Sequence, residues 1–458
     1  MTQDTHTRTV SERLASWGTS LRPDALGQPT IAKSRDILVD IIGLCVAARN
    51  TDYVAAMKAA SEWGDHVMVG HAQRVSAASA ALVNGTAAHG EDFDDTFEGG
   101  PVHSGVVTVP ALLAAAERYH LTNDRVMLGI AAGTELLCRL ALTVPKAVHK
   151  AGFHPTAVLG TFAATFGIAV ACRADAKVIA NALGIAGSMA SGIIEYLGDG
   201  SSTKRMHPGW AAQSGLRAYA MARAGFSGPR AVFEGTHGVF KVFAGSITPK
   251  TDQLFNELGR VFVSNTISFK PYPCGTMVQP YIDCAIKLRR QGAALTDIAS
   301  ITCKTAEGIV HRLWEPLDIK RMPPTPYAAK FSVPFGVALG LARGHADLGD
   351  FTHSAIHDPD LLALAGKTGF VIDPDNPYPA AYTGHVRIEY RNGRVLETRQ
   401  PHLRGGQEAP LTAEQIRTKF RANCTYGNVK NPDSLLAVCE QIGGMQGDYQ
   451  LIKQLAGN

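Results

Sequence analysis

Four short polar segments interrupt an otherwise apolar chain and hold the side chains best suited to chemistry. The first, HGEDFDDTFEGGPVHSG at 89–105, combines five carboxylates with two histidines. His103 comes just before an apolar stretch, starting near Val106, that predicts a helix. A helix N-terminus favours the neutral imidazole, which is the form that a general base needs. Two alternatives stay open: a solvated acidic loop with a capping aspartate, and a site for a hard metal ion.

The second segment is GFHPTAVLG at 152–160, in which a histidine again precedes a predicted helix. Pro155 suits the first position of a helix, so His154 is expected at the helix start. A purely structural cap explains this motif equally well.

The third segment, GDGSSTKRMHPGWAA at 198–212, is basic. Lys204 and Arg205 are expected just ahead of a helix that begins at Pro208. Two cations beside free helix N–H groups suit a carboxylate, and Lys204 could act as a base if burial favoured its neutral amine. An ordinary basic loop is the alternative.

The fourth segment, SFKPYPCGTMVQPYID at 268–283, lies where the character of the sequence changes. Lys270 and Tyr272 offer a cation and a phenol between two prolines. Clefts between domains are frequent ligand sites, although a plain linker would show the same pattern.

Several common catalytic signatures are missing from the sequence. There is no GxxxxGK[ST] loop, no GxGxxG after a strand, no GxSxG, no HExxH and no CxxC pair. Nucleotide cofactors, a nucleophile elbow and a local zinc site therefore have no support from motifs.

Helical periodicity dominates the first 265 residues. Predicted helices fall at about 30–49, 76–89, 109–120, 124–144, 156–172, 175–189 and 208–223. From about 262 onward, strands are predicted at 298–305 and in a hairpin around Asn392-Gly393, with a helix at 328–342 between them and helices again from 411 to 455. The predicted fold is mainly α: a large helical domain from both chain ends (1–266 and 404–458) and an inserted, smaller α+β domain (267–403).

Composition excludes several classes of protein. The 458 residues are 45% hydrophobic and 18% charged, which argues against disorder, and a net charge of +4 without a basic run argues against a nucleic-acid binder. No secretory signal or uninterrupted apolar span is evident, so a cytoplasmic protein with no membrane association is predicted. The eight scattered cysteines are expected to be reduced, and the 46 glycines to let helices pack closely.

Taken in order, the four segments resemble the MmgE/PrpD family. The similarity rests on DFDDT followed by His103, then GFHPTA, TKRMHPGWAA and FKPYPCG with ID downstream, and it covers nearly the whole chain. That family includes 2-methylcitrate dehydratase, cis-aconitate decarboxylase and iminodisuccinate epimerase. The resemblance implies a helical domain with an α+β lid domain, a homodimer, and an active site between the domains that needs no metal or organic cofactor.

The resemblance also implies which side chains surround a small di- or tricarboxylate substrate. His103 and Lys204 are predicted to be catalytic, and the predicted binding residues are Asp92, Thr96, His154, Arg205, Lys270, Tyr272 and Gln279. Many family members have a histidine at the position of Gln279, and an amide cannot transfer protons at neutral pH.

The chemistry that the resemblance implies is proton transfer at a carbon next to a carboxylate, which needs a base and stabilisation of an enediolate-like charge. Losing a third proton-transfer group costs an epimerase least. The sequence therefore favours cofactor-independent epimerisation of an imino- or amino-dicarboxylic acid such as iminodisuccinate, with His103 and Lys204 as the two bases. The alternatives are a lyase of the 2-methylcitrate dehydratase type and a non-catalytic carboxylate-binding protein.

Overall fold

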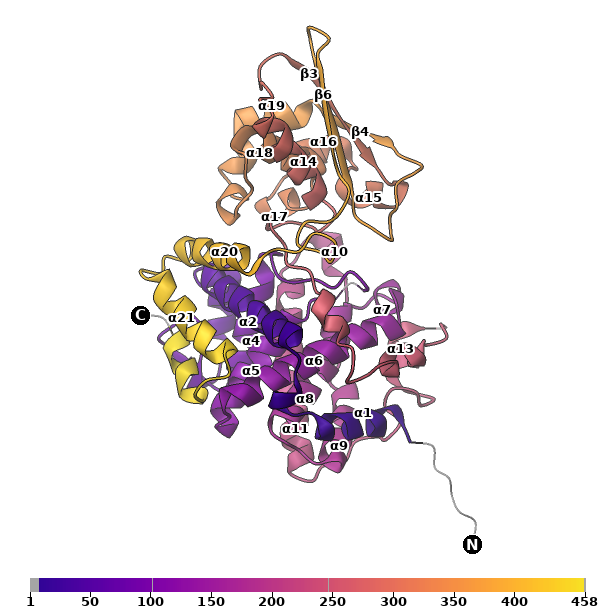
Figure 1. The fold of residues 1–458 in the computed structure, drawn as a ribbon, viewed down its shortest axis with the longest axis vertical. Coiled ribbons are helices and arrows are strands. Elements are labelled where there is room, and N and C mark those ends of the chain that lie inside the picture. The colour runs from indigo at the N-terminus through magenta and orange to yellow at the C-terminus, as the bar shows by residue number, and fades with distance from the viewer. Residues whose placement is uncertain (1–7, 101, 246, 457–458) are drawn as a thin grey trace. The chain divides into compact units, whose positions relative to one another are not determined.

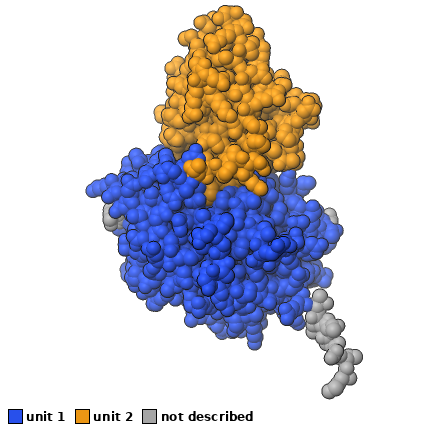
Figure 2. All heavy atoms as spheres, viewed as in Figure 1, with its two compact units in different colours: residues 1–90, 94–267, 413–458 blue, residues 91–93, 268–412 orange. Residues whose placement is uncertain are grey.

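The computed structural model describes residues 8–100, 102–245 and 247–456, and the chain divides into two compact units. Unit 1 contains the chain up to residue 90, residues 94–267, and the chain from 413 onward; unit 2 contains 91–93 and 268–412 (Figure 2). Unit 1 is helical apart from a small hairpin, and unit 2 combines helices with one sheet. The predicted mainly α fold with a smaller α+β part is therefore confirmed.

Long apolar helices form the body of unit 1 (Figure 1). They are α2 (Gln28–Ala48), α4 (Ala77–Gly90), α5 (Gly105–Tyr119), α6 (Asn123–Thr143), α8 (Pro155–Ala171), α9 (Ala176–Gly187) and α11 (Thr203–Arg223). Shorter elements are α1 (Val10–Ser20), α3 (Asp52–Ala59), α7 (Ala147–Lys150), α10 (Tyr196–Asp199), α12 (Val239–Ala244), α13 (Thr251–Phe255), β1 (Trp63–Val67) and β2 (Arg74–Val75). All 17 residues of α8 are buried, so this helix is central to the unit.

Glycines allow α4 and α11 to cross at very short range. A Cβ atom on Gly209 would lie 2.1 Å from the carbonyl oxygen of Leu82, and one on Gly85 would lie 2.5 Å from the Cα of Gly209. Neither position tolerates a side chain without moving backbone. The expectation that glycine permits close helix packing is confirmed at this crossing, which brings together the two helices that carry His89 and Lys204.

Helix α6 is long and apolar enough to cross a membrane, yet 94% of its apolar 18-residue stretch is buried inside the protein. Two of its four charged residues pair within the core, since Arg139 Nε donates to Glu135 Oε1 at 2.6 Å. Glu135 also accepts from the backbone N–H groups of Val263 and Ser264. These contacts make α6 a core helix that organises the 253–264 loop.

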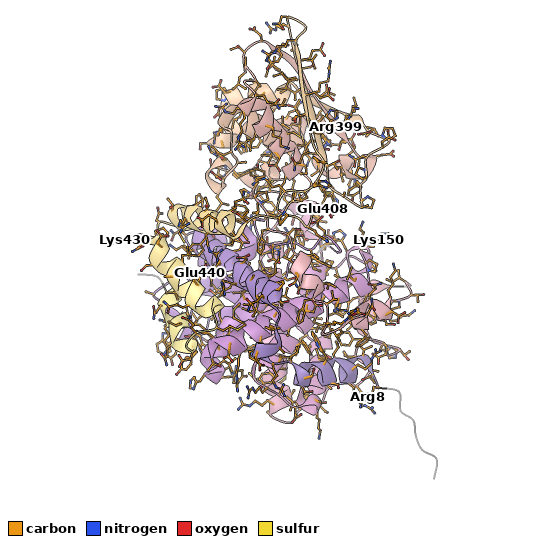
Figure 3. The ribbon with its side chains drawn as sticks, in the orientation of Figure 1. Arg8, Lys150, Arg399, Glu408, Lys430 and Glu440 are labelled. Atoms are coloured by element: carbon orange, nitrogen blue, oxygen red, sulfur yellow. The ribbon has the colours of Figure 1, made fainter. Side chains whose placement is uncertain are left out.

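The C-terminal helices α20 (Ala413–Tyr426) and α21 (Pro432–Gly443) complete unit 1. Lys419 of α20 forms a buried ion pair with Asp40 of α2 at 2.8 Å. Arg417 pairs with Glu440 of α21, which Figure 3 labels, at 2.5 Å. Both ends of the chain therefore build one helical body.

Unit 2 is organised around a four-stranded sheet of order β4-β3-β5-β6. The strands are β3 (Ile298–Thr305), β4 (Thr368–Ile372), β5 (Gly384–Tyr390) and β6 (Val395–Gln400); β3 runs parallel to β4 and antiparallel to β5. The predicted β5–β6 hairpin is confirmed. Strand β4 had no prediction, because its five residues show no clear alternation.

Helices cover the sheet of unit 2. They are α14 (Gln279–Arg290), α15 (Val310–Leu313), α16 (Leu317–Arg321), α17 (Pro326–Ala329), α18 (Val333–Arg343) and α19 (Pro359–Gly366). The single helix predicted at 328–342 is wrong, because the chain breaks between α17 and α18 at Ser332. The Ser332 hydroxyl accepts from the N–H of Phe335, and Pro334 sits in the first turn, so a new helix starts there.

Candidate active site

Four histidine rings from four helix ends of unit 1 form a contiguous cluster. His89 ends α4, His103 precedes α5, His154 caps α8 and His207 lies in the first turns of α11. The ring of His89 lies 5.0 Å from His103 and 5.7 Å from His154, and His154 lies 5.2 Å from His207. We call these residues the imidazole cluster.

An aspartate is buried at one end of the cluster. Asp94 Oδ2 lies 2.9 Å from His89 Nδ1 and 3.1 Å from His103 Nδ1. Burial alone would raise the pKa of Asp94, but the two imidazoles outweigh it and hold the pKa well below its usual range. Asp94 is therefore ionised at neutral pH.

The contacts of His103 decide its tautomer. Its Nδ1 faces the backbone carbonyl oxygen of Asp95 at 2.7 Å as well as Asp94 Oδ2, and both are acceptors. The Nδ1 atom must therefore carry the proton of the neutral ring, which leaves the lone pair on Nε2. His103 is the one partly exposed member of the His89–Asp94–His103 group, so its Nε2 is suited to act as a base.

The predicted placement of His103 at a helix start is confirmed. Asp95 accepts from the backbone N–H groups of Ser104 and Gly105, each at 2.9 Å, where α5 begins. Burial and the charge of Asp94 raise the pKa of Asp95 to about 7. The next residue, Thr96, is also buried, and the His103 N–H is held by the hydroxyl of Thr156 at 3.2 Å.

At the other end of the cluster, His154 and His207 share a hydrogen bond of 3.1 Å between their Nδ1 atoms. Burial and then the nearby histidines hold the pKa of His154 well below its usual range, and burial and then Lys204 lower that of His207 to about 4. Both rings are therefore neutral at pH 7. Pro155 begins α8 directly after His154, as predicted.

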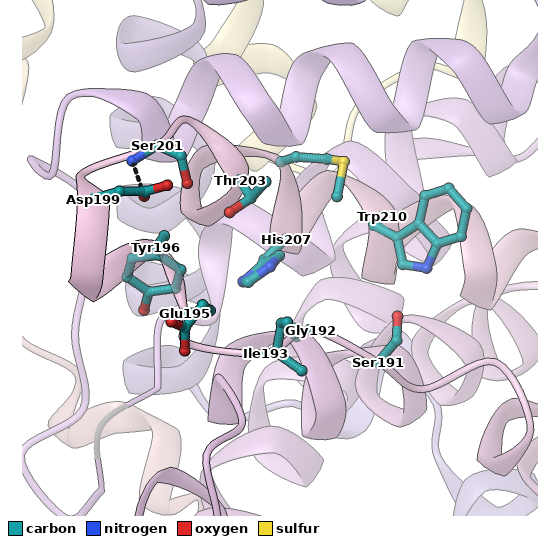
Figure 4. A pocket seen from close by; sticks show the side chains of 12 residues that line it. Ser191, Gly192, Ile193, Glu195, Tyr196, Asp199, Ser201, Thr203, His207 and Trp210 are labelled. Atoms are coloured by element: carbon teal, nitrogen blue, oxygen red, sulfur yellow. Dashed lines mark hydrogen bonds between the residues drawn. The ribbon is translucent and has the colours of Figure 1, made fainter.

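His207 projects into a pocket of about 500 Å³ (Figure 4). The described lining residues are Ala157, Ser191, Gly192, Ile193, Glu195, Tyr196, Asp199, Ser201, Thr203, Met206, His207 and Trp210. None of these is Lys or Arg. The pocket therefore offers an apolar wall and an imidazole, while positive charge must come from beyond its lining.

Lys204 supplies such charge, although the predicted start of its helix is wrong. Helix α11 begins at Thr203, so Lys204 and Arg205 lie in its first turn and Pro208 lies inside it. Five residues of α11 precede Pro208, so its missing N–H removes one backbone hydrogen bond of the second turn. The charge of Lys204 lowers the pKa of three imidazoles, those of His89, His154 and His207.

Arg205 contacts the end of α4. Its Nε donates to the carbonyl oxygen of Gly90 at 3.2 Å, and its guanidinium lies 4.9 Å from the ring of Tyr53. Arg205 therefore helps to hold the helix end that carries His89.

In unit 2, two buried lysines bind two consecutive acidic residues. Lys270 Nζ donates to the carbonyl oxygen and to Oδ1 of Asp92, at 2.9 and 3.1 Å. Lys330 Nζ makes the same pair of contacts with Glu91, at 2.7 and 2.5 Å. Asp92 has a φ of 57°, so these lysines stabilise a left-handed turn that few residue types adopt. We call this group the lysine clamp.

Tyr272 and Gln279 make contacts that shape the loop of unit 2 in which they lie. The Tyr272 hydroxyl donates to Asp283 at 2.7 Å, and burial and then Asp283 raise its pKa. The Gln279 amide donates to the carbonyl oxygens of Tyr272 and Cys274 at 3.5 and 3.3 Å. Both side chains are buried and hold the path of the 270–279 loop.

The structure thus assembles the predicted His103, His154 and Lys204 in unit 1 and the predicted Asp92 and Lys270 in unit 2. The prediction missed five residues, which are His89, Asp94, Asp95, His207 and Lys330. Four of them lie inside the polar segments, so the segments marked the region but not the roles. Nothing in the sequence pointed to Lys330, because it lies outside the four polar segments, between α17 and α18.

The His89–Asp94–His103 group also tests the metal alternative. Its three donor atoms lie within 4.8 Å of one another, which is compatible with one metal ion. The two Nδ1 positions, however, already carry protons that bond to Asp94 or the Asp95 carbonyl. A metal would have to displace both protons.

Comparison with known proteins identifies the family. The MmgE/PrpD N-terminal domain matches residues 12–252, and the MmgE/PrpD C-terminal domain matches residues 272–437. The chain belongs to the MmgE/PrpD family. The predicted family is thus confirmed, and the two matched domains span both units.

Relatives within the MmgE/PrpD family cover almost the full chain. The cis-aconitate decarboxylase-like protein oryM of Aspergillus oryzae is 25% identical over 92% of each chain. The cis-aconitate decarboxylase of Mus musculus is 24% identical over 98% of this chain and 94% of its own length. That of Aspergillus terreus is 26% identical over 90% of this chain and 88% of its own.

These relatives are named decarboxylases, so they give no support to an epimerase. The predicted substrate, homodimer, cytoplasmic location and domain boundaries stay predictions.

Proposed function

We propose that the protein is a lyase that transfers a proton at a carbon atom next to a carboxylate of a tricarboxylic acid. The observation that carries this proposal is the imidazole cluster, with an ionised aspartate at one end and Lys204 acting on three of its rings. Within the cluster His103 is the ring suited to moving a proton, because it is partly exposed and lies beside the ionised Asp94. The pKa values of the other three rings lie well below 7, so these rings stay neutral and can act as hydrogen-bonding groups.

His103 is the proposed acid–base residue. When the ring is neutral its lone pair lies on Nε2, and its side chain is the partly exposed one beside Asp94. Asp94 compensates the positive charge that His103 carries when it is protonated. His103 would act as the base in a dehydration, and as the acid that protonates carbon after loss of CO₂ in a decarboxylation.

Lys204 is the proposed partner for the developing negative charge. Removing a proton or CO₂ next to a carboxylate leaves an enediolate-like anion, which a fixed ammonium group stabilises more than it stabilises the ground state. The neutral His154 and His207 then serve as hydrogen-bonding groups. The pocket of about 500 Å³ that His207 lines has the usual volume of a small-molecule site, and its lining includes neither His103 nor Lys204.

Two observations favour a lyase over the epimerase that the sequence suggested. The relatives are named as decarboxylases over nearly their whole length. Gln279 was the residue that suggested an epimerase, and its amide donates hydrogen bonds to two loop carbonyls. Its presence therefore does not select between the reactions.

The test is NMR in D₂O with cis-aconitate, 2-methylcitrate and iminodisuccinate, each offered separately. We expect loss of CO₂ or of water from a tricarboxylate, with deuterium in any new C–H bond. Deuterium exchange into iminodisuccinate without net product would instead establish the epimerase. Tight binding of all three without reaction would support a binding protein. A parallel assay with a chelator tests the metal alternative.

A further inference from the structure

One carboxylate oxygen of Asp94 is hydrogen-bonded to His89 Nδ1 and lies within ion-pair distance of His103 Nδ1, whose own hydrogen bond goes to the backbone carbonyl oxygen of Asp95. Asp94 Oδ2 lies 2.9 Å from His89 Nδ1 and 3.1 Å from His103 Nδ1. The side chains of His89 and Asp94 have no exposed surface, whereas 14% of the His103 side chain is exposed. Only His103 of the three can therefore meet a substrate in this conformation.

The tautomer of His89 follows from its contacts. Its Nδ1 faces the ionised Asp94 and must donate, so its lone pair lies on Nε2. Burial, opposed by Asp94, lowers the pKa of His89 to about 4, so the ring is neutral at pH 7. Its Nε2 is buried with no hydrogen-bond partner in the described part of the chain. His89 is thus a neutral donor to Asp94.

The negative charge of Asp94 is only partly compensated by its other contacts, so it can stabilise a positive charge on His103. Its second oxygen, Oδ1, is also buried and has no hydrogen-bond donor among the described residues. A buried carboxylate is stabilised by a nearby cation far more than a solvated one is. Protonation of His103 to an imidazolium therefore places a cation beside the buried Asp94 carboxylate and stabilises that carboxylate.

His89 also fixes the positions of two rings. Its ring meets that of His103 edge-on at 5.0 Å and stacks on that of His154 at 5.7 Å. Arg205 holds the carbonyl of the adjacent Gly90. A shift of His89 would therefore move both His103 and His154.

We propose that Asp94 and His89 are positioning residues for His103. The Asp95 carbonyl, 2.7 Å from Nδ1, holds the Nδ1–H tautomer of His103. Asp94 adds the negative charge that stabilises the imidazolium, and His89 orients Asp94 through a single N–H bond. This deepens the proposed function, because it explains how His103 becomes an effective base. In a dehydration, Nε2 of His103 takes the proton from substrate carbon and passes it to the departing hydroxide, which leaves as water. In a decarboxylation, the protonated ring gives its Nε2 proton to the carbon that has lost CO₂. Both Nδ1 protons stay in place in either case.

The test compares variants that keep or remove each hydrogen bond. Asp94→Asn should lower kcat by about 10²- to 10³-fold, since it removes the negative charge that stabilises the His103 imidazolium. His89→Phe keeps the ring and loses the donor, so kcat should fall about 10- to 100-fold. His89→Asn places an N–H near the original Nδ1 and should recover most of that loss. Exposed Asp65→Asn and His237→Asn are the matched controls and should leave kcat unchanged.

A second readout does not depend on catalysis. In protein labelled with ¹⁵N-histidine, His103, assigned with His103→Gln, should show a protonated Nδ1 and an unprotonated Nε2. Asp94→Asn should keep this tautomer, because the Asp95 carbonyl still accepts from Nδ1, but it should lower the pH at which the ring takes its second proton, while the melting temperature shows that the variant is folded. An Nε2–H tautomer in the unmodified protein, an unchanged His103 titration in Asp94→Asn, or equal kcat for His89→Phe and His89→Asn would overturn the proposal. If no lyase substrate is found, the titration still decides the role of Asp94 separately from the proposed function.

Discussion

The imidazole cluster of unit 1 and the lysine clamp of unit 2 use the same kind of carboxylate for different purposes. Asp94 and Asp92 are two positions apart in the chain, yet they belong to different units. Asp94 faces two imidazoles, and Asp92 faces the amino group of Lys270. An imidazole can take or release a proton at its second nitrogen, whereas a lysine paired with a buried carboxylate holds charge and backbone in place. The comparison separates a group that moves protons from a group that holds a turn.

The largest effect is expected for removal of the proposed base. His103→Ala should lower kcat by about 10²- to 10⁴-fold without unfolding unit 1, because general acid–base catalysis contributes on that scale. The measurement is steady-state turnover of whichever tricarboxylate the protein consumes. Full turnover in this variant would remove His103 from the mechanism.

A smaller loss of activity is expected when Lys204 is replaced. Lys204→Met keeps the length of the side chain but removes the charge that should stabilise the transition state, so kcat should fall about 10²-fold. The same change should raise the pKa of His207 from about 4 towards its ordinary value, because Lys204 is the second cause of its lowering after burial. A histidine NMR titration checks this shift; an unchanged pKa would mean that Lys204 does not act on the cluster.

Loss of a lysine from the lysine clamp should lower the stability of unit 2. Lys270→Met leaves Asp92 buried without its cation, which should destabilise unit 2 by about 3–5 kcal/mol. The double variant Lys270→Met with Asp92→Asn should recover much of that loss. Hydrogen exchange of the β3–β6 sheet is the measurement, with Arg290→Met at an exposed site as the control. Equal losses in the single and double variants would show that the pair is not what holds this turn.

Asp95 should make stability depend on pH. Its pKa is raised to about 7 in the folded protein, so the folded state binds the proton more tightly than the unfolded state does. Stability contributed by this group is present below its ordinary pKa and is lost as the pH rises to about 7. The melting temperature should therefore fall between about pH 4.5 and about pH 8, and Asp95→Asn should flatten this part of the profile. An identical slope in the variant would contradict the assignment.

Gln279 is expected to give the smallest effect. Its amide makes two long hydrogen bonds to loop carbonyls, so Gln279→Leu should cost about 1 kcal/mol of stability and leave kcat nearly unchanged. Chemical denaturation and turnover measure the two quantities. A large loss of kcat at full stability would give Gln279 a role in the reaction.

The sequence predicted where helices and strands lie better than it predicted which side chains bond to one another. His103 and His154 could be placed at helix starts because Pro155 and the apolar stretch after Ser104 mark those starts locally. The start of the helix that carries Lys204 was misplaced because Pro208 resembles a helix start, whereas the structure places this proline inside α11. The bond of Asp94 to His89, and that of Lys330 to Glu91, could not be predicted, because they depend on how distant elements pack and not on local spacing.

One measurement tests the central claim most directly, which is that the imidazole cluster transfers a proton at a carbon next to a carboxylate. The unmodified protein and His103→Ala are incubated in D₂O with cis-aconitate and with 2-methylcitrate, and both are followed by ¹H and ¹³C NMR. We predict that the unmodified protein converts one of the two acids, with deuterium in any C–H bond that forms, and that His103→Ala does not. Equal conversion by both proteins, or conversion by neither, would contradict the account.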